Sequence, residues 1–108
     1  MKVLHASRDG NKLILPTKGV TKGIVHIVRE KRLDYDIAIQ VLADGSYEAL
    51  LLRCTHFSNP LIQTGNGFSC PLHGSQFDEH GIVKKGPASL PLTKLPCVAD
   101  GRNIVITV

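Results

Sequence analysis

One segment limits the architecture of this chain more than any other: residues 54–77 contain no Asp, Glu, Lys or Arg. Charged residues make up 20% of the sequence, so about five would be expected among these 24 residues. The segment also contains Asn59-Pro60, Gly65 and Gly74, and residues of these types are typical of turns. A long, turn-rich loop within a small domain is usually functional. We therefore expect residues 54–77 to form a loop that carries the site.

The rest of the chain has the pattern of short strands. Apolar and polar residues alternate through residues 36–43, which places Ile37, Ile39 and Val41 on one face. Asp44-Gly45 follows, and an Asp-Gly pair between two apolar runs predicts a hairpin. No window predicts an amphipathic helix of ten residues or more. Further strands are expected at residues 12–15, 24–28, 47–53, 81–84 and 104–108.

These patterns predict a single all-β domain over residues 1–108, built from small antiparallel sheets. We expect base strands within about 1–53 and 79–108, with a loop subdomain inserted at about 54–78. The longest apolar run is only four residues, at positions 49–52, which predicts a soluble chain without a membrane span. Such a chain is cytoplasmic, or it is tethered at the cell envelope if an N-terminal anchor precedes this sequence.

Composition narrows the choice of partner and of cysteine chemistry. The formal charge is +4, the basic residues form no long block, and only five aromatic residues are available for base stacking. This composition argues against a nucleic-acid partner. The three cysteines are an odd number, which excludes a complete disulfide framework. Cys97 has no Cys or His near it in the sequence, and we expect it to be a buried free thiol.

The uncharged segment contains two short pairs of metal-binding residues. Cys54-Thr55-His56 is followed, after thirteen residues, by Cys70-Pro71-Leu72-His73. Thiolate and imidazole ligands together suit zinc, copper or an iron–sulfur cluster. Zinc fingers take both sulfurs from one pair and both imidazoles from another, whereas each pair here is mixed. A [2Fe–2S] cluster with two cysteines on one iron and two histidines on the other accounts for the mixing.

The pattern resembles the Rieske family of iron–sulfur proteins. The resemblance implies a cluster-binding subdomain that holds one [2Fe–2S] cluster, with Cys54 and Cys70 on the inner iron and His56 and His73 on the outer, more exposed iron. It also implies that the loop containing Gly86 and Pro87 covers the cluster from a third side. The motifs that carry the resemblance are Cys54-Thr55-His56, Cys70-Pro71-Leu72-His73-Gly74-Ser75-Gln76-Phe77-Asp78 and Gly86-Pro87-Ala88.

Departures from the family pattern bear on the branch and on the potential. Asn59 and Leu72 stand where members from cytochrome bc complexes have a disulfide, so the chain resembles the disulfide-free branch that includes oxygenase ferredoxins. Ser75 matches a serine that donates to a cluster sulfide in high-potential members, although a serine after Gly74 also suits an ordinary turn. Phe77 replaces a tyrosine that bonds a ligand sulfur in those members. We expect an intermediate potential within the Rieske range.

The function implied by this resemblance is one-electron transfer, as a carrier or as a subunit of an oxidoreductase system without a substrate site of its own. A redox partner protein would dock at the uncharged face around His56 and His73. One alternative is the ferredoxin component of an aromatic-ring oxygenase. An alternative of another class is a structural zinc domain that acts as an interaction module.

Overall fold

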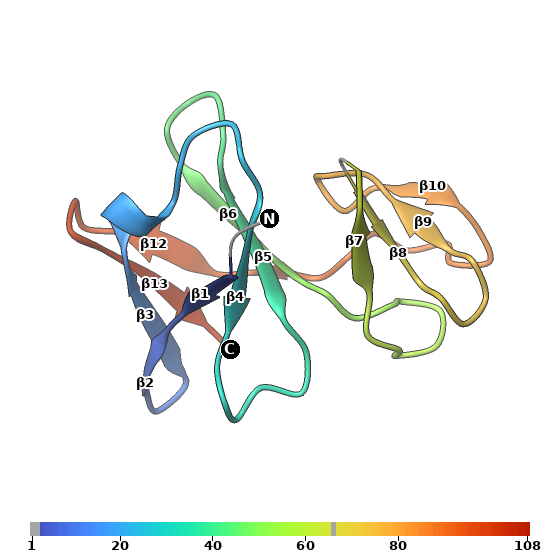
Figure 1. The fold of residues 1–108 in the computed structure, drawn as a ribbon, viewed down its shortest axis with the longest axis horizontal. Helices are drawn as coiled ribbons and strands as arrows, with labels where there is room; N and C mark the ends of the chain where they lie inside the picture. The colour runs from blue at the N-terminus through green and yellow to red at the C-terminus, as the bar shows by residue number, and fades with distance from the viewer. Residues whose placement is uncertain (1–2, 66) are drawn as a thin grey trace.

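The computed structural model describes residues 3–65 and 67–108 and forms two lobes, which lie side by side in Figure 1. The larger one, called the base lobe below, contains two sheets. The smaller one, called the cluster lobe below, contains a third sheet and both Cys–His pairs. The described residues contain no α-helix, only a 3-10 turn at Thr17–Gly19, and the predicted all-β class is confirmed. No helix in the described part of the chain is long and apolar enough to cross a membrane.

The central sheet of the base lobe contains five strands in the order β1-β4-β5-β6-β11. β1 pairs with β4 in parallel, and the other neighbours are antiparallel. The predicted hairpin at Asp44-Gly45 joins β5 to β6, and Gly45 takes a φ of 87°, which a side chain would oppose. The strands are β1 (Val3–His5), β4 (His26–Arg29), β5 (Ile37–Val41), β6 (Tyr47–Leu51) and β11 (Lys94–Leu95).

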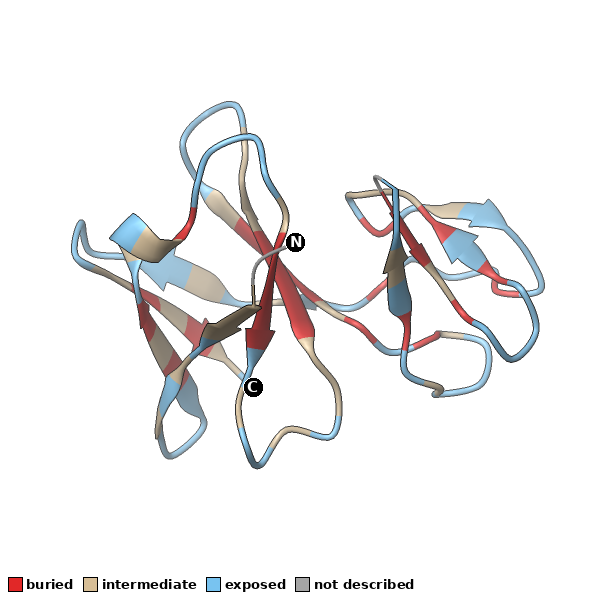
Figure 2. Ribbon diagram, viewed as in Figure 1, coloured by how far each residue is buried: buried red, intermediate tan, exposed pale blue. Residues whose placement is uncertain are grey.

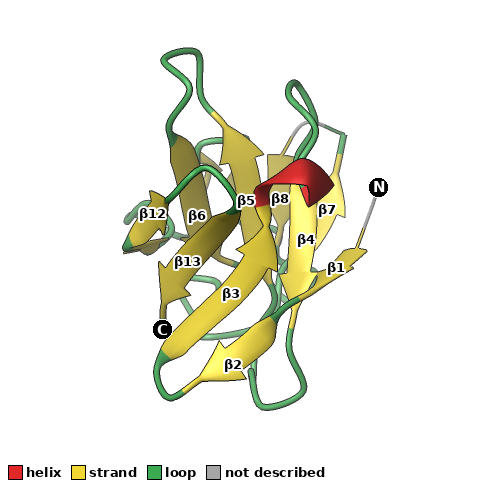
Figure 3. Cartoon of the chain, turned by 90° about the vertical axis from the view of Figure 1, so that its left-hand side faces the viewer, coloured by secondary structure: helices red, strands yellow, loops and turns green. Residues whose placement is uncertain are grey.

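The second sheet of the base lobe is antiparallel and has the order β12-β13-β3-β2. Figure 3 shows this sheet in front of the central sheet. An Asp-Gly turn at Asp100-Gly101 joins β12 to β13. The strands are β2 (Ser7–Asp9), β3 (Lys12–Pro16), β12 (Cys97–Ala99) and β13 (Asn103–Thr107).

The cluster lobe is built on an antiparallel sheet with the order β10-β9-β8-β7. Gly67 is required at the start of β8, because a Cβ there would collide with the carbonyl of Phe77. The predicted end of the loop subdomain, near residue 78, falls between β9 and β10, which pair with each other. The strands are β7 (Ile62–Thr64), β8 (Gly67–Ser69), β9 (Gln76–Phe77) and β10 (Val83–Lys85).

The expectation of a loop throughout residues 54–77 is therefore wrong in part, since β7, β8 and β9 all lie in that segment. These strands contain only two or three residues each, which is too short for a period-two pattern to appear. The predicted strand at residues 81–84 begins two residues later, as β10. The turns expected from Gly65 and Gly74 are present, and both glycines have positive φ.

The central sheet is buried on both faces, and each face contributes to a different hydrophobic core (Figure 2). Ile37 and Ile39 point toward the second base sheet and join the core between the two base sheets. Ala38 and Leu50 point the other way and join a second core. That second core includes both Cys54 and Cys70. The loops that carry the two Cys–His pairs are thus packed onto the back of the central sheet.

Candidate metal centre

The first Cys–His pair lies in a tight turn that follows β6. The backbone N–H of Ser58 donates to the carbonyl of Cys54 at 2.9 Å, and the N–H of Cys54 donates to the carbonyl of Asn59, also at 2.9 Å. Ser58 closes the turn in the left-handed region, with a φ of 42°, although it is not a glycine. These two hydrogen bonds fix the backbone on both sides of His56.

The second pair, which follows β8, repeats this closure. The N–H of Gly74 donates to the carbonyl of Cys70 at 2.9 Å, and the N–H of Cys70 donates to the carbonyl of Ser75 at 2.8 Å. Gly74 is also left-handed, with a φ of 80°. The two turns therefore have the same hydrogen-bond pattern, with Ser58 where the second has Gly74. That equivalence is not visible from the spacings, because the histidine is two residues after the cysteine in one pair and three in the other.

The predicted ligands are neighbours by type: the side chains of Cys54 and Cys70 interact, and the rings of His56 and His73 are in contact. The Cys54 and Cys70 residues are each only 1% exposed, whereas His56 and His73 are both exposed. The two imidazole rings lie edge to face with centroids 5.3 Å apart, and the ring of Phe57 lies 5.7 Å from that of His73. The thiols are thus inside the lobe and the imidazoles are at its surface.

The surroundings of Cys54 favour a thiolate. Burial raises the pKa of this thiol, but hydrogen bonds from the backbone N–H groups of Phe57 and His56 and from the side chains of Cys70 and Ser75 outweigh it. The pKa of Cys54 is therefore below its usual value. Metals bind thiolates rather than thiols, so this environment suits a metal ligand.

The donor set also fits a two-iron centre. Both cysteines are free thiols and not a disulfide. Within residues 3–65 and 67–108, no three Cys, His, Asp or Glu side chains converge as they would around a single ion. A Rieske-type [2Fe–2S] cluster takes two cysteine and two histidine ligands, and the two Cys–His pairs offer that set.

Ser75 connects the second turn to the loop that contains Gly86 and Pro87, called the proline loop below. Its side chain is completely buried, and its Oγ accepts a hydrogen bond from the N–H of Ala88 at 3.1 Å. Hydrogen bonding with the Ser75 side chain is also one of the causes that lower the pKa of Cys54. Gly86-Pro87, a cis peptide, directly precedes Ala88 and is exposed. The proline loop is therefore fastened to the turn that carries the second pair.

A second hydrogen bond ties the same loop to the first turn. Thr55 donates through Oγ1 to the carbonyl of Leu90 at 2.7 Å. Phe77, by contrast, is a core residue: it is 1% exposed and pairs across the sheet with Phe68. Cys97 differs from expectation, since it is only partly buried, at the margin of the base core. Partial burial of the Cys97 thiol raises its pKa to about 11.

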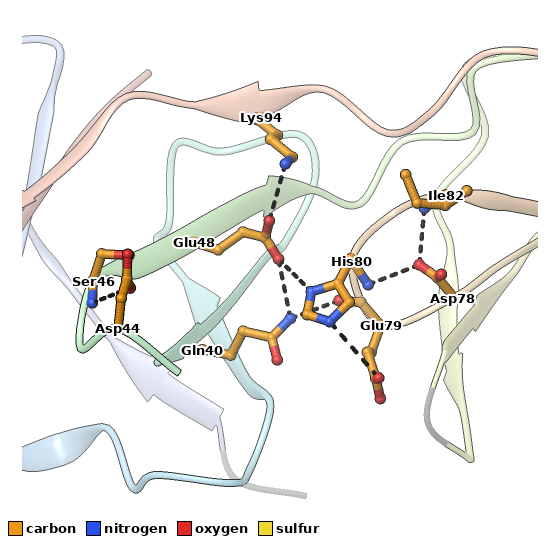
Figure 4. A network of polar contacts seen from close by, with 9 residues as sticks. All are labelled: Gln40, Asp44, Ser46, Glu48, Asp78, Glu79, His80, Ile82 and Lys94. Atoms are coloured by element: carbon orange, nitrogen blue, oxygen red, sulfur yellow. Dashed lines mark hydrogen bonds and ion pairs between the residues drawn. The ribbon is translucent and has the colours of Figure 1, made fainter. Parts of the chain in front are cut away.

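A polar network that the sequence did not predict joins the two lobes (Figure 4). Glu48, on β6, is nearly buried and lies between three partners: Gln40 Nε2 at 3.2 Å, His80 Nδ1 at 3.1 Å and Lys94 Nζ at 3.1 Å. Gln40 also donates to the carbonyl of Glu79 at 2.6 Å. The hydrogen bond to Glu48 raises the pKa of His80, against the opposing effect of burial. Its members are far apart in the sequence, so no local pattern reveals it.

A family model now decides between the metals. The model of the Rieske [2Fe-2S] domain matches residues 12–96, which is most of the chain and includes all three motifs. The chain belongs to the Rieske [2Fe-2S] domain family. The predicted family and the predicted cofactor, one [2Fe–2S] cluster, are confirmed, and the zinc alternative is not favoured.

Curated relatives of this Rieske domain are larger proteins. The ubiquinol-cytochrome c reductase iron-sulfur subunit of Rickettsia typhi is 52% identical over 48 residues, which cover 42% of this chain and 27% of that protein. The cytochrome b6-f complex iron-sulfur subunit of Volvox carteri is 43% identical over 69 residues, covering 60% and 34%. The matches thus span about a third or less of the length of these relatives.

Solved Rieske structures have the same fold. A plasma-membrane Rieske protein of Synechocystis PCC 6803 superposes with a TM-score of 0.58 at 23% identity, over 91% of this chain and 87% of the other. The ferredoxin of Sphingomonas yanoikuyae B1 gives a TM-score of 0.53 at 26% identity, over 86% and 93%. With the family match, these findings confirm the predicted general function of the Rieske domain, electron transfer through its cluster.

Proposed function

We propose that this Rieske domain exchanges single electrons with a partner protein at the face that carries His56 and His73. Cys54 and Cys70 would hold the inner iron and the two histidines the outer one. The observation that carries the proposal is the contrast in exposure within each pair, where the cysteines are 1% exposed and the imidazoles are at the surface. An electron would therefore cross only a ligand side chain between the outer iron and a docked partner.

The residues around the site bear on the potential. When bound, the cluster supplies a one-electron centre whose histidine ligation corresponds to a potential of roughly −150 to +300 mV. Reduction adds one negative charge, so a hydroxyl proton directed at Cys54 favours the reduced state. Ser75 offers such a proton, whereas Phe77 has no hydroxyl to offer. With the hydroxyl of Ser75 present and a hydroxyl at position 77 absent, we expect an intermediate potential.

The docking face would be the uncharged, apolar surface beside the histidines. Phe57 is 60% exposed and Leu72 is 50% exposed, and each directly neighbours a ligand histidine in the sequence. An apolar surface without charges loses little hydration energy when a partner covers it. The names of the relatives, subunits of cytochrome complexes, support redox partner proteins for this chain as well.

A second candidate role is that of a ferredoxin that delivers electrons to an oxygenase. The observation that favours it is the absence of a loop disulfide: Leu72 is exposed, and Asn59 forms a backbone hydrogen bond with Cys54. Similarity to the ferredoxin of Sphingomonas yanoikuyae B1 points in the same direction. The assignment of the ligands is the same in both roles.

Electron self-exchange between oxidised and reduced copies tests the docking face without a known partner. Leu72→Glu would place a repelling charge on that face and should slow self-exchange at low ionic strength. Val98→Glu is the control, because Val98 is 68% exposed on β12 in the base lobe. Equal slowing in both variants, or none in Leu72→Glu, would argue against the face.

The ligand assignment needs a separate test. His56→Gln and His73→Gln should each abolish the red-brown [2Fe–2S] absorption, because each removes one of two protein ligands on the outer iron. His80→Gln should keep it, since His80 contacts Glu48 instead of the centre. A normal spectrum in either of the first two variants would refute that histidine as a ligand.

A further inference from the structure

A base-lobe tyrosine reaches the first metal-binding turn. Tyr35 lies in the segment between β4 and β5, and its hydroxyl donates to the carbonyl of Ser58 at 2.7 Å. Ser58 is 23 residues further along the chain. The contact joins the base lobe to the residue that closes the turn around His56.

The backbone beside Tyr35 is itself fixed. The guanidinium of Arg29 contacts both carboxylate oxygens of Asp36, at 3.1 and 2.8 Å. This pair joins the two ends of the segment between β4 and β5. The carbonyl of Asp36 accepts a hydrogen bond from the N–H of Leu52 at 2.9 Å. Leu52 lies two residues before Cys54, so Tyr35 and the entry to the metal-binding turn share one anchored piece of sheet.

Ser58 is a place where such support matters. It is in the left-handed region, with a φ of 42°, a conformation that is unfavourable for a residue with a side chain. A hydrogen bond to its carbonyl fixes the peptide plane that follows, and its own N–H donates to the carbonyl of Cys54. Between these two bonds lie His56 and Phe57, whose N–H groups donate to the sulfur of Cys54.

We infer that Tyr35 is a positioning residue for the metal centre: its hydroxyl holds Ser58, and through Ser58 it orients the N–H groups of His56 and Phe57 toward the Cys54 sulfur. The inference rests on the proposed roles of Cys54 and His56 as ligands. Hydrogen bonds to a ligand sulfur stabilise the reduced state more than the oxidised one, because reduction adds negative charge. Loss of the Tyr35 hydroxyl should therefore lower the midpoint potential.

The test compares Tyr35→Phe with Tyr47→Phe in the cluster-loaded protein. Tyr47 is the matched control, because it lies on β6 at the margin of the base core and its hydroxyl makes no hydrogen bond among the described residues. At the potential that half-reduces the wild type, the ratio of reduced to oxidised Tyr35→Phe protein should be about threefold lower. Its EPR g-values should shift as the orientation of His56 changes. Tyr47→Phe should match the wild type in both measurements.

Two outcomes would overturn the inference. One is a Tyr35→Phe protein that melts at a lower temperature but has the potential and g-values of the wild type, since the tyrosine would then only stabilise the fold. The other is an equal shift in both variants, which would reflect loss of any tyrosine hydroxyl. Failure of the proposed ligand set is distinguishable, because the wild-type protein itself would then lack a Rieske EPR signal.

Discussion

Ser75→Ala is the substitution whose consequences the structure specifies most fully. The hydroxyl is completely buried and accepts the N–H of Ala88 at 3.1 Å, and its hydrogen bonding with Cys54 helps to lower the pKa of that thiol. Alanine fits the same space but leaves the N–H of Ala88 without its partner. Both the stability and the potential should therefore fall.

The magnitudes follow from the two lost hydrogen bonds. An unsatisfied buried N–H costs about 1–3 kcal/mol, which sets the expected loss of stability. A hydrogen bond to a charged acceptor contributes about 1.5–3 kcal/mol, and roughly half of this would depend on the added electron. At about 59 mV per 1.4 kcal/mol for one electron, Ser75→Ala should lower the midpoint potential by about 30–65 mV.

A spectropotentiometric titration of the loaded protein checks this value. Ser89→Ala is the control, because Ser89 is exposed and lies only one residue beyond Ala88. The reasoning is refuted if Ser75→Ala loses stability but keeps the wild-type potential, for Ser75 would then be an ordinary turn residue. A wild-type potential at the low end of the Rieske range would also contradict a favourable contact from Ser75.

Three further predictions concern the rest of the chain. Ser58→Gly should raise the stability by about 0.5–1 kcal/mol, visible as a higher melting temperature, because glycine takes the left-handed conformation without steric cost; an unchanged or lower melting temperature would contradict this. Cys97, with a pKa of about 11 against 9.0 for a free thiol, should react with iodoacetamide about 100-fold more slowly than a free cysteine at pH 8; alkylation at the free-thiol rate would contradict this. The pKa of His80 is raised in the folded protein, so the stabilisation it gives is complete below a pH of about 6.5 and is lost as pH rises through the folded pKa. The melting temperature should therefore decline over that window in the wild type and less in His80→Gln, and parallel curves would contradict a contribution from His80.

The four proposed ligands could be singled out from the sequence because the geometry of each pair is local. Within each pair, a cysteine and a histidine two or three residues apart must lie close together whatever the rest of the chain does. The β5–β6 hairpin could also be predicted from the sequence, because the Asp-Gly turn and the alternation of Ile37 and Ile39 are patterns of only a few residues. Local sequence patterns thus indicate the proposed ligands and the hairpin that leads into the first pair.

The remainder depends on contacts between distant residues. β9 contains only two residues and exists because its neighbours β8 and β10 pair with it. The Glu48 network joins residues up to 46 positions apart, from Glu48 to Lys94, and Tyr35 meets Ser58 across 23. No periodicity or spacing encodes such pairs, so they become visible only in the folded chain.

The most direct test of the central claim is pulsed EPR of the reduced protein, which detects nitrogen atoms bound to iron. The assignment of His56 and His73 to the outer iron predicts a Rieske-type signal with two strongly coupled imidazole nitrogens, from a protein containing two irons and two sulfides per chain. A signal without nitrogen coupling, or a colourless protein that contains zinc, would contradict it.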